Sequence, residues 1–137
     1  MRNLKRAAVY AAVLMLFLLT WLMMGASCSF STANVKNALM TTAVDENNQP
    51  ADSVTEFDVG AEAYLSAELH NAPDDTTITF VWYYEGEELD SVSVDNQGLS
   101  DTMLSSNIVV PQAGNYSVEV YIDDRDKPDT TVEFTAE

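Results

Sequence analysis

Carboxylates are the most abundant chemically active groups in this sequence. The chain has 22 Asp and Glu residues among 137 but a single histidine, His70. A glycosidase pair requires two carboxylates in a cleft, one of them with a raised pKa. A serine triad requires a histidine near a nucleophile motif, and no such motif accompanies His70. We therefore predict that the chain is not an enzyme and that His70 is a solvated loop residue.

One group of aspartates is the best candidate for a metal site: Asp123, Asp124, Asp126 and Asp129. Carboxylate oxygens are the hard ligands that Ca²⁺ prefers. The segment lacks the glycine and the terminal glutamate of an EF-hand loop, and Arg125 and Lys127 weaken its negative field. Two interpretations stay open, a bound Ca²⁺ and a solvated hairpin tip, and no other cofactor is expected.

Three tyrosines form the candidate ligand-binding set. Tyr64, Tyr83 and Tyr121 lie on predicted strands and point away from the apolar residues of those strands. Tyrosine offers broad contact area at low entropic cost, so we expect either an exposed aromatic patch or rings that cover the sheet.

The N-terminus has the order of an export signal. Three basic residues within residues 1–6 precede an uncharged apolar run at 7–24, which small residues follow. The sequence Gly25-Ala26-Ser27-Cys28 resembles the lipobox of bacterial lipoproteins, in which the cysteine is lipidated and becomes the new N-terminus. Gly25 departs from that pattern, because an aliphatic residue is usual there. Cys28 is the only cysteine, so no intramolecular disulfide can form.

Two alternatives to lipidation at Cys28 remain. The apolar run is near the roughly 20 residues that span a bilayer, so it can stay uncleaved as an anchor. Its basic end then faces the cytoplasm. Cleavage to a free protein is the other alternative. All three place the following domain outside the cytoplasm.

The charge distribution restricts the partners. All 22 acidic residues follow residue 44, and only Lys36, Arg125 and Lys127 are basic after the apolar run. Such a surface repels phosphates, so we expect no nucleic-acid partner. The expected partners are the membrane, through the N-terminal segment, and an envelope or extracellular protein or glycan. The sequence leaves the oligomeric state open.

Alternating apolar and polar residues predict an all-β domain of seven or eight strands. The expected segments are residues 38–44, 54–59, 62–69, 76–84, 89–94, 99–110, 115–122 and 130–136. They give three regions: a signal peptide or membrane-anchor helix at 1–27, a tether at 28–37, and the domain at 38–137.

Two features favour an immunoglobulin-like antiparallel β-sandwich. Trp82 lies in the middle of the most apolar segment, where such domains keep a core tryptophan. Gly114-Asn115-Tyr116 resembles the tyrosine corner that opens a late strand of these domains.

The chain also resembles a group of small bacterial and archaeal lipoproteins of unknown function. The resemblance spans roughly residues 34–136 and rests on the run from Phe57 through residues 63–69, on Asn71-Ala72-Pro73, on residues 79–84, on residues 111–121 and on Val132-Glu133-Phe134. It implies an immunoglobulin-like or fibronectin-like sandwich and no active site. We interpret the chain as an exported, membrane-anchored, non-enzymatic binding or envelope accessory module. A calcium-dependent adhesion domain is the alternative, and a periplasmic hydrolase or inhibitor is a remote third.

Overall fold

The computed structural model describes residues 31–137, which form one compact unit. The expected signal or anchor segment and Cys28 lie outside these described residues. None of the described residues belongs to a helix long and apolar enough to cross a membrane.

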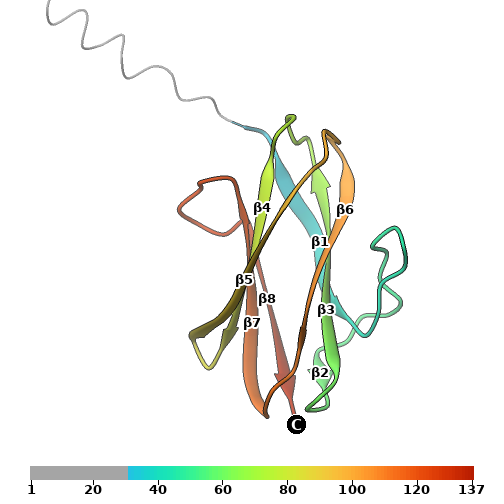
Figure 1. The fold of residues 1–137 in the computed structure, drawn as a ribbon, viewed down its shortest axis with the longest axis vertical. Coiled ribbons are helices and arrows are strands. Elements are labelled where there is room, and N and C mark those ends of the chain that lie inside the picture. Colours follow the sequence, from blue (N-terminus) through green and yellow to red (C-terminus); the bar gives the residue numbers. More distant parts are fainter. Residues whose placement is uncertain (1–30) are drawn as a thin grey trace, which may run out of the picture. The chain divides into compact units, whose positions relative to one another are not determined.

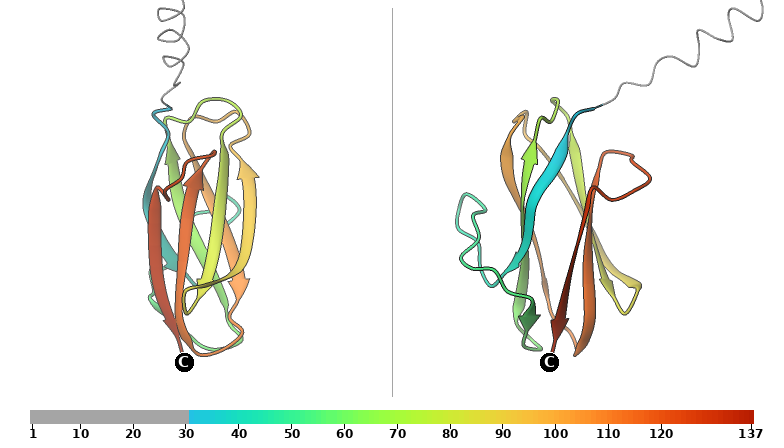
Figure 2. Two further views of the ribbon diagram at one scale, coloured as in Figure 1. Left: turned by 90° about the vertical axis from the view of Figure 1, so that its left-hand side faces the viewer. Right: turned by 180° about the vertical axis from the view of Figure 1, so that it is seen from behind.

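Eight strands form two facing sheets, as Figures 1 and 2 show from three directions. The three-stranded sheet has the order β1-β3-β6, and the five-stranded sheet has the order β2-β8-β7-β4-β5. The strands of the first sheet are β1 (Asn34–Thr41), β3 (Glu62–His70) and β6 (Thr102–Val109). Those of the second are β2 (Glu56–Phe57), β8 (Thr130–Ala136), β7 (Gly114–Ile122), β4 (Thr77–Tyr84) and β5 (Glu87–Asp95). Within the sheets, every pair is antiparallel except β2 and β8. The predicted immunoglobulin-like sandwich is confirmed.

The core lies between the sheets and includes the residues that alternation assigned to it on β3, β4 and β7. Ile78, Phe80 and Trp82 of β4 are 0% exposed, and Val118 and Val120 of β7 face them from the neighbouring strand. The inward residues of β3 are equally buried: Ala63, Leu65, Ala67 and Leu69. Burial of these side chains is the main source of stability for a domain that has no disulfide.

The predicted tyrosine corner is present. The Tyr116 hydroxyl donates a hydrogen bond to the carbonyl oxygen of Gln112, four residues upstream. Its ring stacks on Phe134, with centroids 4.9 Å apart. Phe134 in turn meets Trp82 and Phe57 edge to face. This aromatic cluster closes one end of the core.

The first strand begins earlier than its composition predicts. We expected residues 28–37 to be a tether and the strand to cover 38–44, but β1 runs from Asn34 to Thr41. Val35 is buried, and its backbone N–H donates to Asp129 of the β7–β8 loop at 2.6 Å. The chain crosses Asn37 with a φ of 51°, where the pairing with β3 shifts register. Small polar residues thus enter the sheet because a distant loop holds them.

Candidate binding face

Two of the four aspartates in residues 123–129 make hydrogen bonds that hold the fold together. Asp123 accepts a hydrogen bond from the backbone N–H of Thr77, and Asp129 accepts from Val35. Arg125 lies between them and donates to Asp129 at 3.2 Å and to the carbonyl oxygens of Ser31 and Ala33. The loop therefore ties down the segment that leads into β1.

The four aspartates do not converge. Asp124 and Asp126 are exposed, whereas Asp129 is half-buried against β1. No three Asp, Glu, His or Cys residues within residues 31–137 form a group that could hold a metal ion.

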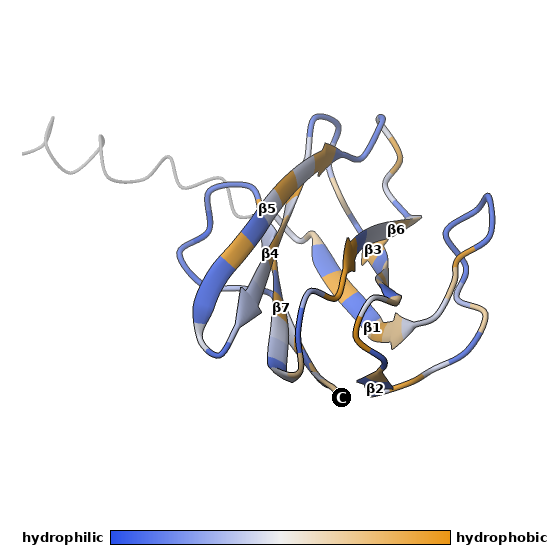
Figure 3. Ribbon diagram, turned by 60° about the horizontal axis from the view of Figure 1, so that its bottom comes forward, coloured by the Kyte–Doolittle hydropathy of each residue, from blue (hydrophilic) through white to orange (hydrophobic). Residues whose placement is uncertain are grey.

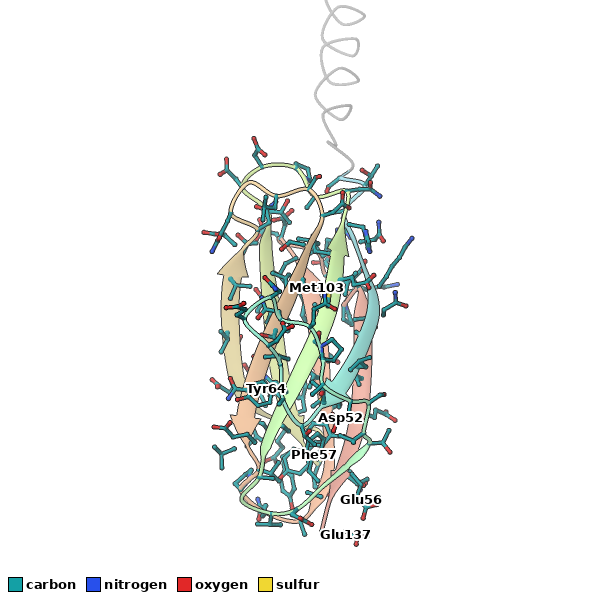
Figure 4. The ribbon with its side chains drawn as sticks, turned by 90° about the vertical axis from the view of Figure 1, so that its right-hand side faces the viewer. Asp52, Glu56, Phe57, Tyr64, Met103 and Glu137 are labelled. Carbon is teal, nitrogen blue, oxygen red and sulfur yellow. The ribbon has the colours of Figure 1, made fainter. Side chains whose placement is uncertain are left out.

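The three candidate tyrosines fall on two different sheets. Tyr64 is on β3 of the three-stranded sheet and donates to Glu62 at 2.7 Å (Figure 4). Tyr83 on β4 and Tyr121 on β7 share the five-stranded sheet. The expected group of three is therefore a pair, with Tyr64 on the opposite side of the sandwich.

Tyr83 and Tyr121 lie near one another on the outer face of the five-stranded sheet, and each influences the pKa of the other. In the antiparallel register, Tyr121 lies opposite Thr79, whereas Tyr83 lies opposite Ser117. Glu119 is on β7, opposite Val81 of β4. In this register it lies between Tyr83 and Tyr121 on the outer face. The Tyr121 hydroxyl donates to a Glu119 carboxylate oxygen.

The pKa values of both phenols reflect this arrangement. The hydrogen bond to Glu119 raises the pKa of Tyr121 to about 12, with burial and the Glu119 charge adding to it. Burial is the first cause that raises the pKa of Tyr83, and Glu119 is the second. Both hydroxyls are therefore neutral at physiological pH, and Glu119 accepts the hydrogen bond from Tyr121.

A polar hollow of about 500 Å³ lies on the same face. Its polar lining comes from β7, β8, the β4–β5 turn and the segment before β2: Glu85, Asn115, Ser117, Glu133, Thr135 and Thr55. Glu85 adopts a φ of +48° and accepts a hydrogen bond from the backbone N–H of Asn115 at 2.9 Å. Ser117 connects the hollow to the tyrosine pair, because it lies opposite Tyr83. We call Tyr83, Glu119, Tyr121 and the polar lining of this hollow the tyrosine face.

The structure also corrects the interpretation of His70 as a solvated loop residue. His70 ends β3, and its two ring nitrogens lie 3.0 Å from Glu68 and 3.2 Å from Asp101. The bond to Glu68 is the first cause that raises the pKa of the imidazole. The spacing of Glu68 and His70 on one strand face is visible in the sequence, but Asp101 reaches them only through the pairing of β3 with β6.

A second acidic pair lies where β2 meets β8. Glu56 and Glu137 approach one another at the end of the sandwich (Figure 4). The charge of Glu137 is the main cause that raises the pKa of the Glu56 carboxyl, and Asp58 adds to it. Sequence reasoning does not find this pair, because the two residues are distant in the chain and meet through a short parallel pairing.

Comparison with known proteins identifies the fold and no family. No family model matches the chain, and no curated protein matches it. A structure of the Pseudomonas fluorescens alkylpurine DNA glycosylase AlkC, bound to DNA containing an abasic site analog, matches with a TM-score of 0.52 and 13% identity. The match covers 78% of this chain but 31% of the glycosylase chain.

Two further matches have lower scores. A CARDB domain from Pyrococcus furiosus, in complex with di-metal ions, has a TM-score of 0.47 and 13% identity over 80% of this chain and 89% of that one. A mutant β-glucosidase from Listeria innocua, in complex with laminaribiose, has a TM-score of 0.44 and 10% identity over 77% of this chain and 16% of that one. At these identities the glycosylase match concerns the fold alone. The chain carries an immunoglobulin-like β-sandwich module.

Proposed function

We propose that this chain is an exported lipoprotein whose sandwich is a non-enzymatic binding module, and that the tyrosine face binds a neutral glycan. The observation that carries the proposal is the convergence of Tyr83 and Tyr121 on Glu119 in an accessible sheet face, next to the polar hollow.

The chemistry of this face suits a ligand rich in hydroxyl groups. The tyrosine rings supply flat apolar area on which a sugar ring can lie, and their hydroxyls supply polar contacts. Carboxylates at Glu85, Glu119 and Glu133 accept hydrogen bonds, and Asn115 both donates and accepts. The concentration of carboxylates disfavours phosphate and sulfate groups, so we expect a neutral glycan.

A non-enzymatic role is consistent with the position of the one histidine. Both ring nitrogens of His70 lie within hydrogen-bonding distance of carboxylates, Glu68 and Asp101. The ring is on the three-stranded sheet, whereas the tyrosine face belongs to the other sheet. His70 is therefore not placed to act as a general base for a ligand bound at Tyr83 and Tyr121.

Glycan binding can be tested with matched tyrosine variants. The full chain, purified in a nonionic detergent, is applied to an array of neutral and anionic glycans, and hits are measured by calorimetry. We expect Tyr83→Ala and Tyr121→Ala each to weaken a neutral hit by about tenfold or more, because each removes a contact platform. Tyr64→Ala is the matched control, since Tyr64 also donates to a carboxylate two residues earlier but lies on the opposite sheet. Equal loss in all three variants, or binding only to a protein partner, would contradict the glycan assignment.

The anchor has its own test at Cys28. Five residues, 29–33, separate Cys28 from β1, so the chain between them reaches roughly 20 Å when extended. We expect the membrane fraction to contain a mature chain that begins at Cys28 and carries acyl chains, measured by intact-mass spectrometry. Cys28→Ser should abolish both the acyl mass and processing. A full-length mass with a free thiol would indicate the uncleaved anchor, and an unmodified shorter chain in the soluble fraction would indicate a free protein.

A further inference from the structure

The two sheets have different widths, which leaves one side of the sandwich open. The five-stranded sheet ends at β5 and the three-stranded sheet ends at β6. These two edge strands border a groove of about 400 Å³, lined by Leu89 and Asp90 of β5 and by Asn107, Ile108 and Val109 of β6. We call this groove and its two strand edges the open edge.

Apolar side chains are exposed along the open edge. Of the nine residues of β5, eight are exposed. Leu89 is 43% exposed, Val92 37% and Val109 58%. Val92 pairs with Phe80, which is fully buried. Val92 therefore points to the inner face of its sheet, but the opposite sheet covers it only in part. Figure 3 shows apolar residues along β5 at the margin of its sheet.

Part of the backbone of β5 is available to another strand. The N–H of Asn96 donates to Thr76 next to β4, so the alternate amides of Ser91, Ser93 and Asp95 point away from β4. Asp90 caps the first of them, because its carboxylate accepts from the N–H of Ser91 at 2.8 Å. The register shifts next to it, between Trp82 and Tyr83 on the partner strand. This bulge and cap protect one end of the edge and leave the amides of Ser93 and Asp95 facing outward.

The open edge is negatively charged. β5 carries four carboxylates: Glu87, Glu88, Asp90 and Asp95. The basic residues of the described chain, Lys36, Arg125 and Lys127, lie on β1 and in the β7–β8 loop, and Arg125 is already bound to Asp129. A second copy of this chain would bring a similar acidic strand against the first, and like charges in opposed strands repel. A cationic segment gains from the same field.

We infer that the open edge binds an extended, cationic segment of another protein, which adds a strand to β5. Its backbone pairs with Ser93 and Asp95, its apolar side chains cover Val92 and the groove that Ile108 and Val109 line, and its cations meet the carboxylates of β5. Strand addition of this kind draws affinity from main-chain hydrogen bonds and specificity from alternate side chains. The inference is independent of the glycan proposal, because it concerns the edge and not the outer face of the sheet.

The test uses a model peptide and amide exchange. The full chain in nonionic detergent is mixed with an acetylated and amidated nine-residue peptide in which lysine and valine alternate. We expect the amides of Ser93 and Asp95 to exchange about tenfold more slowly at saturating peptide. Binding should weaken several-fold between about 0.05 M and about 0.5 M salt, because exposed charges are screened.

Three controls decide between occupants. A peptide of the same charge with proline at its centre cannot pair along the strand, and equal protection by it would overturn the inference. Protection by an alternating glutamate–valine peptide would overturn the predicted charge preference. Protection that rises with protein concentration alone, together with a dimer in ultracentrifugation, would assign the edge to a second copy and also overturn it.

Matched variants locate the contact. Ser93→Ala and Ser93→Pro both lose the hydroxyl contact to Thr79, 2.8 Å away, but only the proline variant loses the outward amide. We expect Ser93→Pro to bind the lysine–valine peptide at least tenfold more weakly than Ser93→Ala. Val109→Lys should bind more weakly than Val109→Glu, since both replace the same groove-lining side chain and the lysine adds a charge that repels the cationic peptide. Thermal melts establish that all four variants are folded, and equal affinities within each pair would refute the contact.

Discussion

The indole N–H of Trp82 donates a hydrogen bond to the hydroxyl of Ser106 at 3.1 Å, across the space between the two sheets. Trp82 is on β4 and Ser106 is on β6, so the bond joins strands of opposite sheets. The contact is a polar link between the two sheets of a domain that has no disulfide.

Truncation of this tryptophan should be the most damaging core substitution. Trp82→Ala removes a side chain that is fully buried and contacts Phe134, so we expect a loss of about 3–5 kcal/mol in the free energy of unfolding. Ser106→Ala isolates the polar part of the contact, because it leaves the buried indole N–H without a partner, at a cost of about 1–3 kcal/mol. Urea denaturation measures both. A Trp82→Ala variant as stable as the parent would contradict the sandwich core described here.

The tyrosine corner should contribute through its hydroxyl. Tyr116→Phe keeps the ring stacked on Phe134 but removes the bond to the Gln112 carbonyl, and we expect a loss of about 1 kcal/mol. Tyr64→Phe is the surface control and should lie within about 0.5 kcal/mol of the parent. Chemical denaturation of the two variants side by side checks the difference, and equal stabilities would show that the corner is not energetically important.

The sequence predicts the core better than it predicts the surfaces. Alternation assigned Leu65 and Trp82 to the interior, because successive side chains of a strand point to opposite faces and one face of β3 and β4 packs against the other sheet. It could not show that Tyr64 and Tyr121 lie on opposite sides of the molecule, since the sheet to which each strand belongs is set by distant pairings. The extension of β1 was missed for a similar reason: Val35 is held by Asp129, which is 94 residues away.

The carboxylates around His70 should make stability depend on pH. The pKa of His70 is raised above 6.5, first by the hydrogen bond to Glu68. The stability that His70 contributes to the folded state is therefore complete below pH 6.5 and is lost as the pH rises through the pKa of His70 in the folded state. The pKa values of Glu68 and Asp101 are lowered, by His70 and by the Asn71 N–H respectively. Their contributions are complete above pH 4.5 and are lost as the pH falls further.

The cluster therefore stabilises the fold most between about pH 4.5 and pH 6.5. His70→Gln should flatten the melting temperature of the full chain across pH 6–9 relative to the parent, since glutamine does not titrate. Lys36 also lowers the pKa of Glu68 through its charge, so Lys36→Gln serves as the control and should leave the alkaline decline in place. A parent melting curve that is flat across this range would exclude the role of His70.

The acidic pair at the end of β8 should oppose stability at neutral pH. Glu137 and then Asp58 raise the pKa of Glu56 above 4.5, so the folded state holds this proton more tightly than the unfolded state does. Stability must then fall as the pH rises from 4.5 through the pKa of Glu56 in the folded state, and the repulsion persists above that pH.

Glu56→Gln removes this repulsion and keeps the shape of the side chain. We expect a higher melting temperature than the parent at pH 7 and a smaller gain at about 1 M salt, because salt screens the repulsion. The gain should vanish well below pH 4.5, where Glu56 is protonated in both the folded and the unfolded state. Glu87→Gln, on the exposed strand β5, is the matched control for the loss of one negative charge. If the two variants gain equally at pH 7, general charge repulsion and not the Glu56–Glu137 pair is responsible.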